Sequence, residues 1–262
     1  MKIELRDLCF GYAGEKLFSN LSADFTDGER PLVILGPSGS GKTTLLKLLG
    51  GLLKPQSGSV VFYETEPALE KPSGAEGAGG ELKTAEPRIA FVFQEPRLLP
   101  WLSVLENVSL PLEKHYGREE ARARARRFLS LAFLEDKAEA RPRELSGGQA
   151  QRVSMARAFA WPAPALFMDE PFQSLDIPLR LSLMDLTLSL LREEKRLLIA
   201  VTHDPREALY MGGRIIVLGK PGGGFAFDRI VEFPAGDYSS AAAVELEREL
   251  ILALKAGGNL RG

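Results

Sequence analysis

A glycine-rich stretch between two apolar runs carries the most specific chemical signal in the sequence. Residues 36–44 read GPSGSGKTT, follow the apolar run 32–35 and precede the leucine-rich run 45–49. A strand, a glycine-rich loop and a helix in this order form a phosphate-binding loop, because converging N–H groups and the helix N-terminus attract anions. The alternative is a flexible glycine–serine linker, but a linker would not require the apolar runs on either side of it. The residues expected to bind the nucleotide are Gly36, Pro37, Ser38, Gly39, Ser40, Gly41, Lys42, Thr43 and Thr44.

Two residues of this loop have distinct chemical roles in such a site. Lys42 would reach the β- and γ-phosphates, and the Thr43 hydroxyl would ligate Mg²⁺. Two adjacent carboxylates, Asp169 and Glu170, follow the apolar run 165–168. Charges at the end of a buried strand are costly unless they hold a cation or share a task. Asp169 therefore fits a ligand of Mg²⁺, and Glu170 fits the base that activates the attacking water.

Gln94 and His203 follow two further apolar runs, 89–93 and 197–201. The carboxyl ends of parallel strands meet at one edge of a sheet, where α/β proteins bind ligands. Gln94 could be a ligand contact or a strand-end cap. His203 could donate to a γ-phosphate or to another partner, since buried polar side chains need one. The residues alone leave both pairs of interpretations open.

Two further features have an ordinary structural explanation beside a functional one. Ser146 is a natural N-cap before two glycines, so this helix start could be an anion-accepting nest or a capping turn. Tyr12 lies in a glycine turn and could stack on adenine. From the residues alone, we favour an aromatic side chain that packs on its own hairpin.

The elements that must position these residues follow from the apolar pattern. The runs 3–10 and 18–25, each followed by a short turn, predict an antiparallel sheet ahead of the phosphate-binding loop. Later apolar runs, typical of strands buried on both faces, alternate with helical patterns. Residues 64–87, rich in Gly, Pro, Ala and Glu, predict an exposed, mobile loop. The arginine-rich helix at 118–133 predicts a solvated face rather than a nucleic-acid surface.

Composition bounds the class of protein. The 262 residues are 45% hydrophobic and 26% charged, which is typical of a globular protein. The net charge of −2 gives no indication of electrostatic binding to nucleic acid or anionic lipid. The one cysteine, Cys9, cannot form an internal disulfide, which fits a reducing cytosol. Apolar segments stay below the ~18 residues of a membrane span, so we expect any work at a membrane to depend on a partner protein.

The motifs together resemble the ATP-binding cassette (ABC) ATPase family, over roughly residues 3–233. Their order is specific: the phosphate-binding loop, Gln94, LSGGQ at Leu145, DEP at Asp169, SLD at Ser174 and THD at Thr202. The resemblance implies an α/β fold with a P-loop NTPase (RecA-like) core, an N-terminal antiparallel β-subdomain and an inserted helical subdomain. It implies an ATPase domain at 1–235, its helical subdomain at about 96–158, and a C-terminal helical tail at 236–262.

The resemblance also assigns the roles that the residues leave open. Tyr12 matches the aromatic residue that stacks on adenine, and His203 matches the switch histidine. Gln94 matches the glutamine that senses Mg²⁺ and the γ-phosphate. Catalysis would then depend on Glu170, His203 and Gln94, with Mg²⁺ held by Thr43, Gln94 and Asp169.

The LSGGQ signature implies a second copy of the chain. Leu145, Ser146, Gly147, Gly148 and Gln149 match the residues that bind the ATP held by the other subunit. The family therefore implies a head-to-tail homodimer with two ATP molecules in its interface. Asp176 would communicate across that interface.

The run FQEPRLLPW at 93–101 is similar to the ATPases of nitrate, sulfonate and taurine importers. This implies an ATP-hydrolysing subunit of a binding-protein-dependent importer, peripheral at the cytoplasmic face of the membrane. Its partners would be transmembrane permease subunits and, through them, a solute-binding protein. The alternative is a soluble ABC ATPase acting on DNA or ribosomes. Such proteins usually carry coiled-coil insertions, tandem cassettes or a basic surface, whereas this chain has one cassette and a slightly acidic balance.

Overall fold

The computed structural model describes residues 1–26, 30–63, 88–231, 236 and 240–257. The loop predicted at 64–87 lies outside these residues. In the described part, β1 (Lys2–Tyr12) and β2 (Glu15–Thr26) form the antiparallel pair that the sequence predicts. β4 (Ser57–Tyr63) pairs with the other side of β1, which gives a three-stranded sheet in the order β2-β1-β4.

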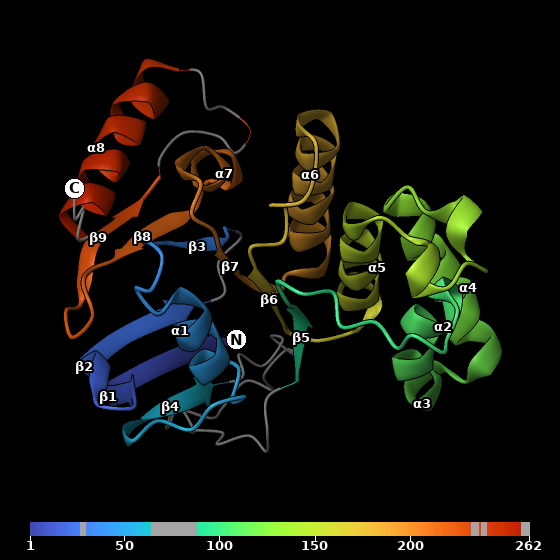
Figure 1. Ribbon diagram of the computed structural model, residues 1–262, viewed down its shortest axis with the longest axis horizontal. Coiled ribbons are helices and arrows are strands. Elements are labelled where there is room, and N and C mark those ends of the chain that lie inside the picture. The colour runs from blue at the N-terminus through green and yellow to red at the C-terminus, as the bar shows by residue number, and fades with distance from the viewer. Residues whose placement is uncertain (27–29, 64–87, 232–235, 237–239, 258–262) are drawn as a thin grey trace, which may run out of the picture.

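A second sheet has six strands in the order β5-β6-β7-β3-β8-β9 (Figure 1). The pairs from β5 to β8 are parallel, and β9 runs antiparallel to β8. The strands are β3 (Leu32–Leu35), β5 (Ile89–Val92), β6 (Ala165–Asp169), β7 (Leu197–Val201), β8 (Arg214–Leu218) and β9 (Phe225–Ile230).

The central strands are buried on both faces, so alternate residues enter two different cores. Ile34 and Ile199 pack with the antiparallel sheet and with α1. Val33 and Ala200, their neighbours in the chain, pack on the opposite face with the helices. The sheet therefore lies between two apolar layers, and its carboxyl edge stays available for polar residues.

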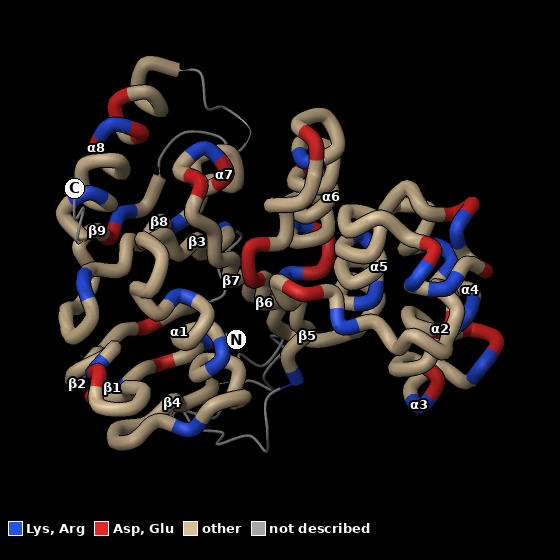
Figure 2. The backbone as a smooth tube through the Cα atoms, viewed as in Figure 1, with Lys and Arg blue, Asp and Glu red and all other residues tan. Residues whose placement is uncertain are grey.

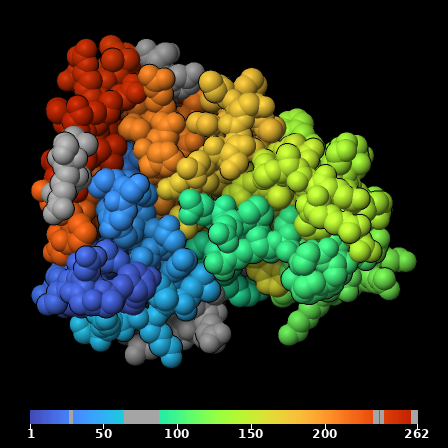
Figure 3. All heavy atoms as spheres, viewed as in Figure 1, coloured from blue at the N-terminus to red at the C-terminus, as the bar shows by residue number. Residues whose placement is uncertain are grey.

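The helices divide by position along the chain. Those that cover the sheets are α1 (Lys42–Leu49), α6 (Ile177–Glu194), α7 (Pro205–Met211) and α8 (Ala241–Gly257). Those between β5 and β6 are α2 (Val104–Ser109), α3 (Glu113–Tyr116), α4 (Arg118–Leu131) and α5 (Gly147–Ala160), with 3₁₀ turns at Leu110–Leu112, Glu135–Lys137 and Pro142–Glu144. The second set forms a separate lobe, green to yellow-green in Figures 1 and 3.

The arginine face predicted on α4 is solvated only in part. Arg126 and Arg127 are exposed. Arg124 is half-buried and donates a 2.7 Å hydrogen bond to the Ala160 carbonyl oxygen at the end of α5. The acidic residues of α4, Glu119 and Glu120, lie in its first turn, and the charged residues after them are arginines, blue in Figure 2.

Candidate nucleotide-binding site

The loop between β3 and α1 has the glycine geometry that its sequence predicts. Gly39 and Gly41 have φ of 80° and 93°, in the left-handed region that favours glycine. A Cβ at Gly41 would also come within 2.9 Å of Phe18 Cζ on β2. The loop can therefore pack this closely against the antiparallel sheet because position 41 carries no side chain.

Lys42, the first residue of α1, is buried within this loop with 7% exposure. Its Nζ donates to the carbonyl oxygens of Gly36 at 2.8 Å and Pro37 at 3.1 Å. Burial lowers the pKa of Lys42, and the charges of Glu170 and Asp169 oppose that shift. The Lys42 ammonium group is therefore held inside the loop, where the backbone N–H groups would bind phosphates.

The Thr43 hydroxyl and the Asp169 carboxyl meet at the end of β6. Thr43 Oγ1 donates a 2.9 Å hydrogen bond to Asp169 Oδ1, and Asp169 is 2% exposed. Burial raises the pKa of Asp169, whereas the Thr43 hydrogen bond lowers it. The sequence predicts these two residues as partners, and the fold brings them together.

This pair fits a divalent cation that arrives with a nucleotide. The described residues contain no cluster of three or more His, Cys, Asp or Glu side chains that could hold a metal ion. Mg²⁺ is usually bound through one or two carboxylates together with phosphate oxygens and water. One buried carboxylate beside one hydroxyl matches that requirement.

Glu170 and His203 form the next contact along the same edge of the sheet. Glu170 Oε2 lies 3.3 Å from His203 Nδ1. Glu170 has a φ of 46°, uncommon for a residue with a Cβ, and its N–H donates to the Val201 carbonyl oxygen at 2.9 Å. Such conformations occur where surrounding contacts fix them, and they cluster at functional sites. The His203 side chain is 52% exposed, so a ligand can reach it.

Gln94 and Tyr12 flank these contacts. Gln94 is exposed and follows β5, the edge neighbour of β6, at the same carboxyl edge. Tyr12 ends β1, and its ring packs edge-on against Phe10 with 5.0 Å between ring centroids. Tyr12 therefore packs on its own hairpin, as its residue context favours, while 51% of it remains exposed.

The signature residues begin α5 on the helical lobe. Ser146 Oγ accepts a hydrogen bond from Gln149 N at 3.3 Å, and Ser146 N donates to Gln149 Oε1 at 2.8 Å. This is a complete capping box. Asp176 caps α6 in a similar way by accepting from Leu179 N at 3.0 Å. Figure 1 shows α5 well apart from α1, so one chain does not place its signature on its own phosphate-binding loop.

Two side chains of α5 that sequence patterns did not single out hold the backbone on both sides of Gln94. Gln151 Nε2 donates to the Phe93 carbonyl oxygen at 3.2 Å. Arg157 donates to the carbonyl oxygens of Pro96 at 2.9 Å and Arg97 at 3.1 Å. Burial lowers the pKa of Arg157. Their signal in the sequence is a long polar side chain among inward-facing apolar residues of a helix.

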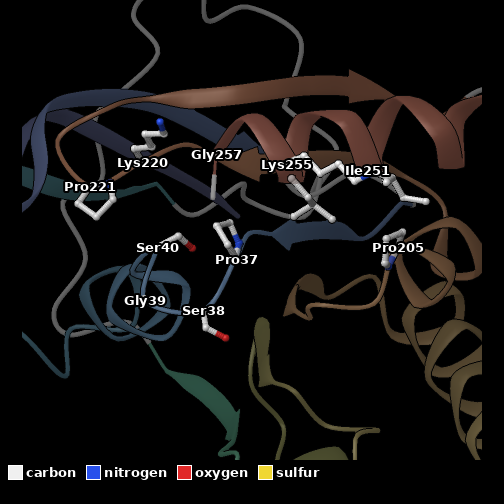
Figure 4. A pocket seen from close by; sticks show the side chains of 11 residues that line it. Pro37, Ser38, Gly39, Ser40, Pro205, Lys220, Pro221, Ile251, Lys255 and Gly257 are labelled. Atoms are coloured by element: carbon white, nitrogen blue, oxygen red, sulfur yellow. The ribbon is translucent and has the colours of Figure 1, made fainter. Parts of the chain in front are cut away.

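A cavity of about 940 Å³ lies between the phosphate-binding loop and α8 (Figure 4). Its lining consists of Pro37, Ser38, Gly39, Ser40, Pro205, Lys220, Pro221, Ile251, Leu254, Lys255 and Gly257. Thr43 and Asp169 do not line it, so the cavity flanks the loop and does not contain their contact.

A sequence profile described as ABC transporter matches residues 18–173. The chain belongs to the ABC transporter family. It is 40% identical over 203 residues to the aliphatic sulfonates import ATP-binding protein SsuB 1 of Xanthomonas axonopodis pv. citri (strain 306), covering 77% of this chain and 75% of that protein. It is 38% identical over 221 residues to the taurine import ATP-binding protein TauB of Pseudomonas aeruginosa (strain PAO1), covering 83% and 78%.

The fold of this ABC protein is also similar to solved ATP-binding cassettes. A dimeric post-hydrolysis structure of the cassette MJ0796 bound to ADP and Pi matches with a TM-score of 0.72 and 33% identity, over 88% of this chain and 100% of that one. The α/β P-loop fold with an antiparallel subdomain and added helices is therefore confirmed. As an ABC ATPase, the chain binds nucleotide and hydrolyses ATP in a transport system.

Proposed function

We propose that this ABC ATPase powers a binding-protein-dependent importer of a sulfonate, of taurine or of a related small solute such as nitrate. The observation that carries the proposal is the placement of Thr43–Asp169 and Glu170–His203 beside the phosphate-binding loop. Support for the solute class comes from the identity to the sulfonate and taurine import proteins. The run FQEPRLLPW at 93–101 adds to that support.

The proposed reaction assigns one task to each residue. Water attacks the γ-phosphorus, the bond to the β–γ bridging oxygen breaks, and ADP and phosphate leave. Glu170 accepts a proton from the attacking water, and His203 donates a hydrogen bond to a γ-phosphate oxygen. Lys42 and the loop N–H groups hold the phosphates, and Tyr12 stacks on the adenine.

The residues that would hold Mg²⁺ are Thr43, Asp169 and Gln94. A bound Mg²⁺ would neutralise charge on the phosphate oxygens. Asp169 contributes the buried carboxylate and Thr43 the adjacent hydroxyl, both already in contact. Gln94 stands exposed at the neighbouring strand end, where its amide oxygen can reach a ligand.

We also propose a head-to-tail homodimer. Each chain presents Ser146 and Gly147 exposed at the start of α5, away from its own phosphate-binding loop. Residues 145–149 of a second copy would therefore close each nucleotide site, and Asp176 would communicate across the interface. The dimeric state of the MJ0796 cassette supports this arrangement.

We propose that the ATPase is located at the cytoplasmic face of the membrane, where it binds permease subunits that link it to a solute-binding protein. None of the described helices combines the length and apolar character needed to cross a bilayer. Trp101 is 65% exposed and Leu110 is 49% exposed on the helical lobe after Gln94, which supports a protein contact there.

We propose that the ATPase domain spans residues 1–235, with the helical subdomain at about 96–158, and that residues 236–262 form a C-terminal tail.

The test is purification of the tagged chain from detergent-solubilised membranes of its native cell. We expect recovery with a multi-helix permease, and vanadate-sensitive ATPase activity that a solute-loaded binding protein stimulates in proteoliposomes. Sulfonates, taurine and nitrate are the solutes to compare. Recovery only with ribosomes or nucleic acid would overturn the transport proposal in favour of a soluble ABC ATPase.

A further inference from the structure

Arg180 lies between two segments that the proposed reaction requires. It occupies the first turn of α6, directly after the SLD segment (residues 174–176). Its Nη2 donates to the Leu175 carbonyl oxygen at 3.2 Å. Its Nη1 lies 3.4 Å from Asp204 Oδ2 and 3.4 Å from Glu207 Oε1. One guanidinium therefore contacts the SLD segment and the start of α7 simultaneously.

The contacts of Arg180 belong to a network that holds the backbone around His203. Thr202 Oγ1 donates a 2.5 Å hydrogen bond to Glu207, and Asp204 N donates to Thr202 Oγ1 at 3.1 Å. The residues on both sides of His203 are thus bonded to each other, and Thr202 is also bonded to Glu207. The Glu207 side chain is 7% exposed, so its charge depends on these partners.

His203 itself takes no part in this network. Its side chain is half exposed and reaches Glu170 at 3.3 Å. Its position is set by the backbone at Thr202 and Asp204. A displacement of the SLD segment would move the Leu175 carbonyl, and with it the guanidinium that pairs with Asp204 and Glu207.

We propose that Arg180 is a positioning residue that couples the SLD segment to His203. This inference rests on the proposed roles of His203 and Asp176. It adds the contacts through which a displacement of the SLD segment would change the position of His203. The planar guanidinium suits this task because its separate N–H groups contact a carbonyl and two carboxylates together. A lysine ammonium could balance the buried charge of Glu207, but it cannot hold three partners in a fixed geometry.

The test compares Arg180→Lys and Arg180→Gln in the full-length purified ATPase, with Arg192→Gln at the exposed far end of α6 as control. We expect Arg180→Lys to retain the melting temperature and the KM for ATP within about twofold, while kcat falls about tenfold. Arg192→Gln should leave both constants unchanged. If Arg180 only balances charge, Arg180→Lys will keep wild-type kcat, and the proposal is overturned.

A double-mutant cycle with His203→Ala tests the route. Because Arg180 would act through His203, adding Arg180→Lys to His203→Ala should lower the residual rate less than twofold. An equal loss in both backgrounds would overturn the proposal while leaving the role of His203 intact. Wild-type turnover by His203→Ala alone would instead refute the proposed role of His203. If Arg180→Lys unfolds, the neutral pair Arg180→Gln/Glu207→Gln takes its place in the cycle.

Discussion

Thr43 Oγ1 donates to Asp169 Oδ1 at 2.9 Å, across 126 residues of sequence. The contact joins the first turn of α1 to the last residue of β6, two strands away from β3 in the sheet. A 2% exposed carboxyl would be costly here without a partner, and the hydroxyl alone compensates it only in part. This contact supports the proposal that Thr43 and Asp169 would hold a cation that arrives with the nucleotide.

Replacing the proposed base should separate ATP binding from ATP hydrolysis. Glu170→Gln keeps the shape of the side chain but cannot accept the proton of the attacking water. We expect kcat to fall ~10²–10³-fold while ATP still binds, and a stable ATP-bound dimer to accumulate. Phosphate release and size-exclusion chromatography with ATP measure both effects. Glu119→Gln, on the exposed start of α4, is the matched control, and wild-type turnover by Glu170→Gln would remove Glu170 as the base.

Lys42→Ala should weaken nucleotide binding. The Lys42 ammonium contacts the Gly36 and Pro37 carbonyl oxygens inside the loop, so its loss removes the cation that would meet the phosphates. We expect affinity for ATP to fall at least ~30-fold, in the range of a lost buried charge–phosphate contact. Titration calorimetry measures it, with Lys54→Ala at an exposed position beyond α1 as control. Unchanged affinity would contradict the assignment of the loop.

The buried Glu207 should give the folded protein a specific pH dependence. Burial raises the pKa of Glu207, and the Thr202 hydrogen bond and the Arg180 charge oppose the shift. The folded state therefore binds more protons than the unfolded state between the ordinary glutamate pKa and the raised one, and Glu207 contributes less stability as pH rises through that window. Relative to the wild type, Glu207→Gln should gain stability as pH rises above the ordinary glutamate pKa, in urea denaturation of the nucleotide-free protein. A stability difference that does not change with pH would contradict this.

Part of the site follows from sequence because several of its residues directly follow apolar runs. Asp169, Gln94 and His203 lie at the carboxyl ends of β6, β5 and β7, which are consecutive in the sheet. Parallel order alone then places them on one edge. The glycines of the phosphate-binding loop are predictable for a local reason, since a φ of 93° at position 41 favours glycine. The contact of position 41 with Phe18 also favours glycine, but it is visible only in the fold.

The contacts of the arginines could not be predicted in the same way. Arg124 lies in a charged helical pattern, yet it reaches the carbonyl of Ala160 on another helix. Arg180 pairs with Asp204 and Glu207, which belong to a different element. Side-chain partners between elements depend on how the elements pack, and that information is absent from local periodicity. The sequence likewise leaves Tyr12 and Ser146 with two interpretations, because a cap and a ligand contact use the same residue types.

The contacts between α5 and the backbone around Gln94 should matter for stability. Arg157→Lys keeps a positive charge but replaces the two separate N–H groups that bond the Pro96 and Arg97 carbonyl oxygens with one ammonium group. This weakens the part-buried hydrogen bond to Pro96 and the exposed one to Arg97. We expect a loss of ~1–3 kcal/mol in the free energy of unfolding, measured by urea denaturation. Arg192→Lys on the exposed end of α6 should change it by less than ~0.5 kcal/mol. Equal stability of the two variants would show that these hydrogen bonds contribute little.

Ser146→Asp should distinguish a helix cap from a contact with the ATP of a second chain. Aspartate caps a helix as well as serine does, so α5 should keep its start, and the melting temperature should stay within ~2 °C. Its negative charge would repel the γ-phosphate held by the partner. In the Glu170→Gln background, we therefore expect ATP to bind but the ATP-bound dimer to disappear from size-exclusion chromatography.

Ser103→Asp is the matched control for this variant, because Ser103 caps α2 through the same kind of capping box with Glu106. It should leave the dimer intact, since Ser103 is not one of the signature residues 145–149. A dimer that survives Ser146→Asp would limit Ser146 to its capping role. Loss of the dimer in both variants would instead indicate that the lobe itself, and not the signature, is sensitive to an added charge.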